Sequence, residues 1–104
     1  MAEMRVVWTD RARNEFQQSM SYYQRGSEKS AQNFRSRLLN QIQLVQKFPG
    51  IGPKQDFVEP RNGEIRYRVE GHFKILYSVL EDTILIVSIF DTRQDPSRLE
   101  ELGQ

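Results

Sequence analysis

Four cationic side chains in the second half of the chain are placed where they could form one binding site. Arg66 and Arg68 alternate with apolar residues in one expected strand, Lys74 lies in the next strand, and Arg93 follows the last. Side chains that face the same way on neighbouring antiparallel strands stand about 5 Å apart, so the four could converge on the sheet face that helices leave uncovered. Converged cations bind an anion, such as a phosphate or an acidic protein surface. The alternative is a solvated face balanced by Glu64, Glu70, Glu81 and Asp82.

Other kinds of chemistry are less well provided for. His72 stands beside Gly71 in an expected turn, where its ring could act as a general base, but no carboxylate partner is evident. Ser78 and Ser88 lie in apolar strands without an evident histidine base, which argues against a serine hydrolase. The chain has no cysteine and a single histidine, so cysteine nucleophiles, disulfides and histidine-rich metal sites are excluded. We expect neither a metal nor a cofactor.

Three aromatic residues are candidates for contact with a partner protein. Trp8, Phe57 and Tyr67 are large side chains of the kind that anchors protein interfaces. The alternative is packing in the core, which we expect for two of the three.

Two helices must position these residues. Thr9 and Asp10 begin the first, whose apolar stripe recurs at spacings of four, four and three until Arg25 and Gly26 end it. Ser27 begins the second, which Pro49 and Gly50 end. The expected stripes are Ala12, Phe16, Met20 and Tyr23 in the first helix, and Ala31, Phe34, Leu38, Ile42, Val45 and Phe48 in the second. The short connection predicts an antiparallel helical hairpin with both stripes on one side.

The strands come before and after this hairpin. A short β-prone run at 5–8 opens the chain, and a loop at 49–63 leads into three strands near 65–69, 73–80 and 84–90. We expect the apolar residues of 65–69 to face the helices and Arg66 and Arg68 to face away. The fold class is α+β, in the order β-α-α-β-β-β. The hairpin packs on a small, mainly antiparallel sheet with the last strand at its centre and the first at an edge.

Length and composition limit the remaining possibilities. The 104 residues suit one domain, 1–104, in which the polar tail at about 97–104 is expected to fray or to form a short helix. The net charge is only +1, although residues 1–52 hold eight Lys or Arg against four Asp or Glu, and residues 53–104 hold seven against ten. This balance argues against indiscriminate binding to nucleic acid. No secretory signal or apolar run of membrane-spanning length is seen, so we expect a cytoplasmic protein.

Five short segments occur along the chain in a fixed order, and the ordered set is more specific than any single motif. The segments are Val7-Trp8-Thr9 with Ala12, Phe48-Pro49-Gly50-Ile51-Gly52, Ile65-Arg66, Phe73-Lys74-Ile75-Leu76-Tyr77, and Asp91-Thr92-Arg93-Gln94-Asp95-Pro96. Together they resemble the RelE/ParE superfamily of toxins from bacterial type II toxin-antitoxin pairs, from about Val6 to Leu99. The resemblance implies a helical hairpin on a small antiparallel sheet, in agreement with the periodicity.

The superfamily contains ribosome-dependent ribonucleases and inhibitors of DNA gyrase. The resemblance implies that a ribonuclease would use Lys74, Arg66 and Arg93, together with a base and an acid. Here Gln55, with Asp56 beside it, occupies the loop position where such members carry a carboxylate, and Thr92 and Arg93 stand where a His-Tyr pair is usual. The sequence of residues 93–96 resembles the ParE branch. The near-neutral net charge points the same way, since a ribonuclease that acts on the ribosome would gain from a strongly basic surface. We therefore predict no catalytic residues, with ribosome-dependent cleavage of messenger RNA as the alternative.

The resemblance also implies partners. We expect a toxin that binds and inhibits DNA gyrase through Arg66, Arg68, Lys74 and Arg93 and that a cognate antitoxin neutralises. Trp8 is the candidate contact for the antitoxin, and DNA would be bound only through the antitoxin. The ribosome with its messenger RNA is the alternative target, and a non-toxic autoregulator that binds only its antitoxin and DNA is a third possibility.

Overall fold

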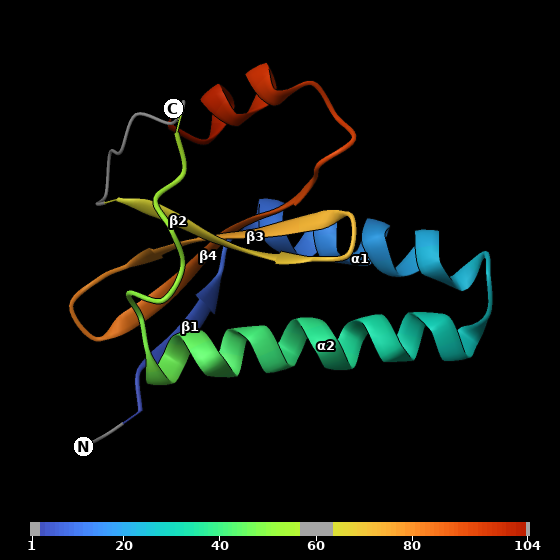
Figure 1. Cartoon of the computed structure of the whole chain (residues 1–104), viewed down its shortest axis with the longest axis horizontal. Helices are drawn as coiled ribbons and strands as arrows, with labels where there is room; N and C mark the ends of the chain where they lie inside the picture. Colours follow the sequence, from blue (N-terminus) through green and yellow to red (C-terminus); the bar gives the residue numbers. More distant parts are fainter. Residues whose placement is uncertain (1–2, 57–63, 104) are drawn as a thin grey trace.

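The computed structural model describes residues 3–56 and 64–103. In this part of the chain two helices follow the first strand, and three strands and a short 3-10 helix follow the helices (Figure 1). The elements are β1 (Arg5–Trp8), α1 (Asp10–Gln24), α2 (Glu28–Lys47), β2 (Ile65–Glu70), β3 (Phe73–Val79), β4 (Thr83–Asp91) and η1 (Pro96–Gly103). The α+β class and the element order are as predicted.

Both helices begin at the predicted caps. The Thr9 hydroxyl accepts a hydrogen bond from the Ala12 amide, and the Ser27 hydroxyl accepts one from the Ser30 amide. These oxygens satisfy N–H groups that have no partner within the first turn of a helix. The caps confirm the predicted starts of both helices, and Figure 1 shows α1 and α2 running in opposite directions as the predicted hairpin requires.

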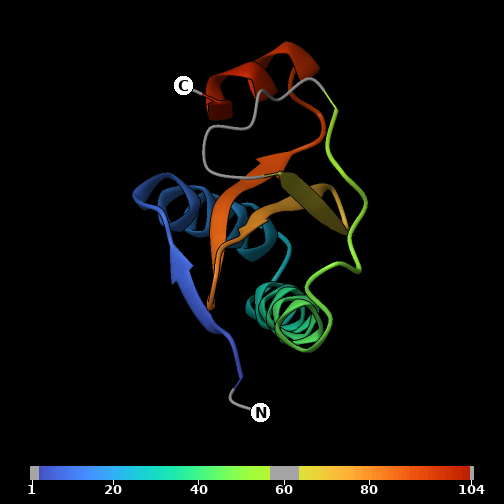
Figure 2. The ribbon, with the colours of Figure 1, turned by 90° about the vertical axis from the view of Figure 1, so that its left-hand side faces the viewer.

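The four strands form one sheet in the order β1-β4-β3-β2. The meander β2-β3-β4 is antiparallel, and β1 pairs in parallel with β4 at the opposite edge. The predicted edge position of the first strand and interior position of the last are therefore confirmed. In Figures 1 and 2, α2 and η1 lie on opposite sides of the sheet.

The main core lies between the sheet and the helical hairpin. The second helix contributes its predicted stripe from Ala31 to Val45, whose members are buried. Phe48 is the exception, because its side chain is 59% exposed. The helix ends at Lys47 and Phe48 leaves it with φ −132° and ψ 76°, so the helical spacing no longer directs this ring toward the sheet.

The facing of β2 differs from the prediction. Arg66 pairs with Tyr77 and Arg68 with Ile75, and both of these β3 residues belong to the core under the helices. Residues directly opposite one another in antiparallel strands share a face. Arg66 and Arg68 therefore lie on the helix side of the sheet, and the prediction that they face away from the helices is wrong.

The reverse face of the sheet carries a second, smaller core. Leu76 and Phe90 from the central strands pack there with Ile65 and with Leu99 of η1. Leu99 is only 4% exposed. Of the two alternatives for the tail, fraying and a short helix, the structure has the short helix, because Leu99 gives the segment an apolar anchor that the sheet needs for cover.

Candidate functional site

Lys74 lies on the reverse face of the sheet. Its Nζ donates a hydrogen bond of 3.0 Å to Oε1 of Gln55 and stands 4.2 Å from the centre of the Tyr67 ring. Its partner across the strands is Val69, which is exposed. Lys74 is thus half-buried between the Gln55 amide and the Tyr67 ring. These two groups can hold the ammonium, but neither the amide nor the ring can act as a general base.

Arg66 is used to hold the loop that follows α2. Its Nη1 donates to the carbonyl of Gly52 at 2.7 Å, and its Nη2 lies 3.4 Å from Oε2 of Glu64. Lys54 pairs with the same carboxylate at 2.9 Å. The hydrogen bond from Lys54 and, to a lesser extent, the charge of Arg66 lower the pKa of Glu64. The Arg66 guanidinium is therefore already engaged by Gly52 and Glu64 within the chain.

A tyrosine hydroxyl anchors the same loop from the core. The hydroxyl of Tyr77, a fully buried residue, donates to the carbonyl of Pro49 and accepts from the Gly52 amide at 3.0 Å. Burial raises the pKa of this phenol. A Cβ at Gly52 would clash with the carbonyl oxygen of Tyr67, so the close approach of loop and strand requires a glycine. Phe57, a predicted aromatic anchor in the same loop, lies outside the described residues.

Arg68 is bound to the second helix. Its Nε donates to Oε1 of Gln41 at 2.9 Å. Beside it, the guanidinium of Arg37 pairs with Glu70 at 3.2 Å. These contacts fasten the outer strand β2 to α2, so Arg68 faces a different surface from Lys74.

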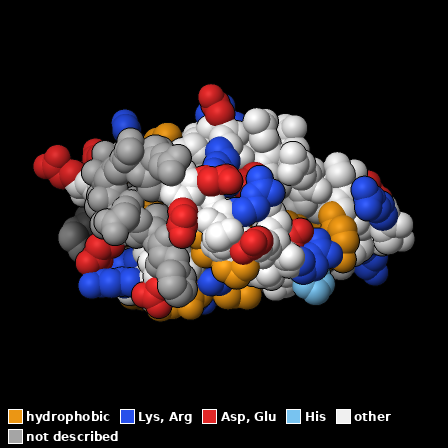
Figure 3. Space-filling model, turned by 90° about the horizontal axis from the view of Figure 1, so that it is seen from above, with side chains coloured by type: hydrophobic (Ala, Val, Ile, Leu, Met, Phe, Trp, Pro, Cys, Tyr) orange, Lys and Arg blue, Asp and Glu red, His pale blue; other side chains and the backbone are white. Residues whose placement is uncertain are grey.

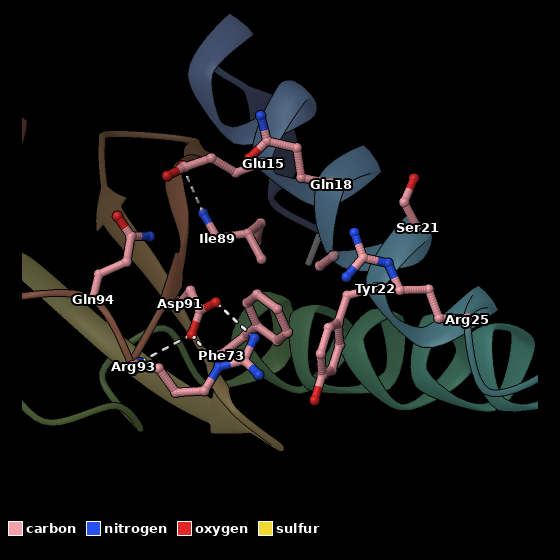
Figure 4. A pocket seen from close by; sticks show the side chains of 11 residues that line it. Glu15, Gln18, Ser21, Tyr22, Arg25, Phe73, Ile89, Asp91, Arg93 and Gln94 are labelled. Atoms are coloured by element: carbon pink, nitrogen blue, oxygen red, sulfur yellow. Dashed lines mark hydrogen bonds and ion pairs between the residues drawn. The ribbon is translucent and has the colours of Figure 1, made fainter.

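Arg93 lies against the first helix. Its Nε and Nη2 donate to the two carboxylate oxygens of Asp91 at 2.9 and 2.7 Å. The guanidinium covers the Tyr22 ring at 4.3 Å from its centre (Figure 4). The hydrogen bond from Arg93 lowers the pKa of Asp91, and the same pairing raises the pKa of Arg93. Asp91 and Tyr22 thus hold the guanidinium in one orientation.

The four predicted cations therefore do not form one cluster. Lys74 lies on the reverse face, and Arg66 and Arg68 lie on the helix side of β2. Arg93, which follows β4, packs against Tyr22 of α1. Two of them, Arg66 and Arg93, are also engaged in ion pairs. On the side seen in Figure 3, basic and acidic side chains are intermixed. The predicted continuous cationic face is wrong.

A cavity of about 330 Å³ opens between α1 and the end of β4, and we call it the Tyr22 pocket. The charged side chains that line it are two arginines and two carboxylates, which stand around Tyr22 (Figure 4). They are Glu15, Arg25, Asp91 and Arg93. Of these, only Arg93 was singled out from the sequence. Arg25 was recognised as a helix-ending cation, but nothing in a local pattern shows that the end of α1 lies beside the end of β4.

Glu15 in the Tyr22 pocket accepts hydrogen bonds from β4, close to an irregularity in the sheet. The pairing of β3 with β4 shifts register between Leu76 and Tyr77. On β4, Ser88 Oγ and the Ile89 amide donate to Oε1 of Glu15, at 2.6 and 3.2 Å. These groups lie beyond Ile86, the last residue of β4 that pairs with β1, and the carboxylate supplies them with an acceptor. Ser88 is thereby a structural donor.

The other residues considered for catalysis or metal binding are His72, Ser78 and the acidic side chains. His72 is exposed in its turn, with its ring centre 6.3 Å from that of Tyr22, and its carbonyl accepts hydrogen bonds from Thr92. Ser78 is buried on the reverse side of β3. Among residues 3–56 and 64–103, no three His, Cys, Asp or Glu side chains are grouped so that they could hold a metal ion.

Trp8 borders a second groove, between the two helices. Its ring packs against Phe16 with 5.6 Å between the centres. The groove has a volume of about 360 Å³ and is lined by Trp8, Arg13, Phe16, Gln17, Arg35 and Leu39. Trp8 is only partly buried, so it belongs both to the edge of the core and to this groove. Tyr67 is likewise half-buried, beneath Lys74.

Within the described residues, no helix is both long enough and apolar enough to cross a membrane.

Comparison with known proteins identifies the family. A search of curated proteins finds no match. Among solved structures, the chain resembles one described as the chromosomal ParDE TA system from P. aeruginosa, with a TM-score of 0.66 and 18% identity, over 84% of this chain and 94% of that one. At this identity, the likeness concerns the fold.

The sequence itself decides the family. Residues 6–96 match the family model described as the ParE toxin of the type II toxin-antitoxin system parDE. The match covers both helices, β1 from its second residue onward, and the other three strands. The chain therefore belongs to the ParE toxin family of type II toxin-antitoxin systems.

Proposed function

We propose that this toxin arrests bacterial growth by binding DNA gyrase without catalysing a reaction, and that a cognate antitoxin neutralises it. Membership of the ParE family supports the toxin role. The observation that carries the choice of a non-catalytic mechanism is the separation of Lys74, Arg66 and Arg93 on three different surfaces. A ribonuclease would need such cations around one phosphate, with a base and an acid beside them.

The cations differ in what they can offer a target. Arg66 and Arg68 already bond to the loop and to α2, so we assign them to holding β2 in place. Lys74 and Arg93 lie at the surface on aromatic rings and are our candidates for contact with gyrase, each on its own surface. An ammonium or guanidinium held on a ring is already ordered, so less conformational entropy is lost when a partner binds.

Gyrase supercoiling in the presence of the purified toxin tests the target. We expect inhibition of supercoiling, while messenger RNA on translating ribosomes stays intact. Cleavage of the message with normal supercoiling would replace this proposal with the ribonuclease alternative. Normal supercoiling and intact message, together with normal growth on expression without antitoxin, would instead favour an autoregulator.

We propose the Trp8 groove as the contact surface for the antitoxin. Trp8, Phe16 and Leu39 offer an apolar floor, and Arg13 and Arg35 stand at its sides. Such a groove suits a helix or extended segment with an apolar anchor and neighbouring acidic side chains. No described residue forms a hydrogen bond or ion pair with the guanidinium of Arg35, so this cation is available for an acidic partner.

A charge reversal at the side of the groove tests this surface. Arg35→Glu should weaken antitoxin binding by about ten-fold, the effect of losing one charge-assisted contact and adding a repulsion. Isothermal titration with the antitoxin measures the change, and Arg98→Glu on η1 is the control with the same change in charge. Equal binding by both variants would remove Arg35 from the antitoxin surface.

A further inference from the structure

The Tyr22 pocket is a polar cavity lined by carboxylates and arginines. Its carboxylates already have hydrogen-bond partners within the chain, whereas N–H groups of its arginines remain available. Glu15 accepts from Ser88 and Ile89 and pairs with Arg11 at 3.6 Å. Asp91 accepts two hydrogen bonds from the Arg93 guanidinium and one from the Arg93 amide. Each carboxylate therefore has an arginine and its own set of donors, although Arg11 also pairs with Glu101. A ligand would find no acidic group in need of a partner.

The unfilled groups are those of arginines. Within the described chain, no hydrogen bond or ion pair engages the guanidinium of Arg25, which is exposed at the end of α1. The hydrogen bonds of Arg93 to Asp91 use Nε and Nη2, and its guanidinium also lies on the Tyr22 ring. Figure 4 shows Arg25 and Arg93 reaching toward the cavity beside Tyr22, from α1 and from the segment after β4. The four charged side chains of the lining balance one another, and Arg25 is the one for which the described residues provide no ion pair.

The pocket is also held rigidly. Asp91 and the Tyr22 ring fix Arg93, and the Tyr22 ring lies edge-on to Phe73 of the core, at 6.5 Å between the centres. Thr92 bonds through both its amide and its hydroxyl to the carbonyl of His72. A guanidinium ordered in advance binds a carboxylate with a smaller loss of conformational entropy than a free one does.

We propose that the Tyr22 pocket is a contact site for gyrase and that it receives an acidic side chain of that protein between Arg25 and Arg93. This inference rests on the proposed function and specifies the surface and the chemistry of the contact. The cavity volume of about 330 Å³ is enough for one carboxylate-bearing side chain with part of its backbone. A carboxylate can accept from two guanidinium groups at once.

The charge distribution favours a protein over the DNA to which gyrase binds. Binding of a nucleic-acid backbone draws its affinity from several neutralised phosphates, and so needs an extended row of cations. The Tyr22 pocket has a single unpaired arginine beside two carboxylates, and the net charge of the chain is only +1. A single acidic side chain matches this arrangement better than a row of phosphates does.

A pair of charge reversals tests the proposal. Arg25→Glu and Lys47→Glu alter exposed cations at the ends of α1 and α2 that have no side-chain partner among the described residues, and they change the net charge equally. We expect Arg25→Glu to raise the toxin concentration for half-inhibition of supercoiling by about ten-fold or more, as the loss of a charge-assisted contact implies. Lys47→Glu should leave this concentration within about two-fold of the unmodified toxin.

Further measurements separate the possible failures. Inhibition by Arg25→Glu equal to that by the unmodified toxin would overturn the pocket assignment while leaving the proposed function intact. If the unmodified toxin does not inhibit gyrase, the proposed function itself fails. Unchanged antitoxin binding and an unchanged thermal midpoint should accompany the loss of inhibition in Arg25→Glu. Parallel loss of antitoxin binding, or loss of binding to DNA alone in a mobility-shift assay, would place a different partner in the pocket and reject the proposal.

Discussion

The two faces of the sheet are covered very differently. On one face, two full helices bury the ring of Phe34 and the side chains of Leu38 and Ile42 against the strands. On the other, the short helix η1 reaches the sheet through Leu99, which meets Leu76 and Phe90. Buried apolar area is the main favourable term in folding, so the helix face holds most of the stability. The reverse face is more readily altered without loss of the fold.

The same contrast applies to the polar side chains. On the helix side, Arg66 and Arg68 bond to the loop and to Gln41, and so contribute to the structure. On the reverse face, the half-buried Lys74 donates to Gln55, which is its one hydrogen-bond partner among the described residues. A cation that connects elements is a poor candidate for partner contact, because binding would have to replace contacts that the fold already uses.

Truncation in the helix-side core should have the largest effect. Phe34 is fully buried and stacks on Tyr23 at 4.4 Å between the ring centres. Phe34→Ala should lower the free energy of unfolding by about 3 to 5 kcal/mol, from lost burial and the cavity that remains. Urea titration followed by circular dichroism measures the change. A loss below about 1 kcal/mol would show that the helices contribute less than the comparison requires.

Truncation on the reverse face should have a smaller effect. Leu99→Ala removes the buried anchor of η1 and should lower the free energy of unfolding by about 2 kcal/mol, the lower end for a buried leucine, because a terminal helix can readjust. The same titration applies, with the exposed Ser97→Ala as control. If Leu99→Ala destabilises the protein as much as Phe34→Ala does, the proposed inequality of the two faces is incorrect.

The ion pair at the end of β4 should have the smallest effect on stability, and acid should abolish it. Because Arg93 lowers the pKa of Asp91 in the folded protein, the pair stabilises the fold above the pKa of an unfolded aspartate, about 3.9. This stabilisation is lost as the pH falls through the lower, folded pKa. Arg93→Gln should therefore make the thermal midpoint fall less steeply between about pH 5 and pH 2. Arg35→Gln is the control, and equal slopes for the two variants would contradict the role of the pair.

The helical half of the fold could be predicted because its signals are local. Thr9 and Ser27 cap helices through hydrogen bonds to amides three residues ahead, and the stripe from Ala31 to Val45 reports a period that holds throughout a helix. Phe48 departed from the stripe because the helix ends at the residue before it. A stripe predicts burial only while the backbone remains helical.

The facing of β2 could not be predicted in the same way. Alternation divides Arg66 and Arg68 from Tyr67 and Val69, but it does not say which set faces the helices. β2 is an edge strand, where the helix-side residues reach past the core to Gln41 and to the loop carbonyls. An arginine can bury its stem there and still satisfy its guanidinium.

By itself, the sequence determined the two helices, the order of the strands, the family resemblance and the presence of the cations, because caps and periodic patterns act over a few residues. The tertiary structure decided which cations meet. Register and packing brought Arg25 at the end of α1 to the same cavity as Arg93 after β4, and directed Arg66 and Lys74 to opposite faces. These contacts join residues far apart in the chain, and their geometry depends on the whole fold.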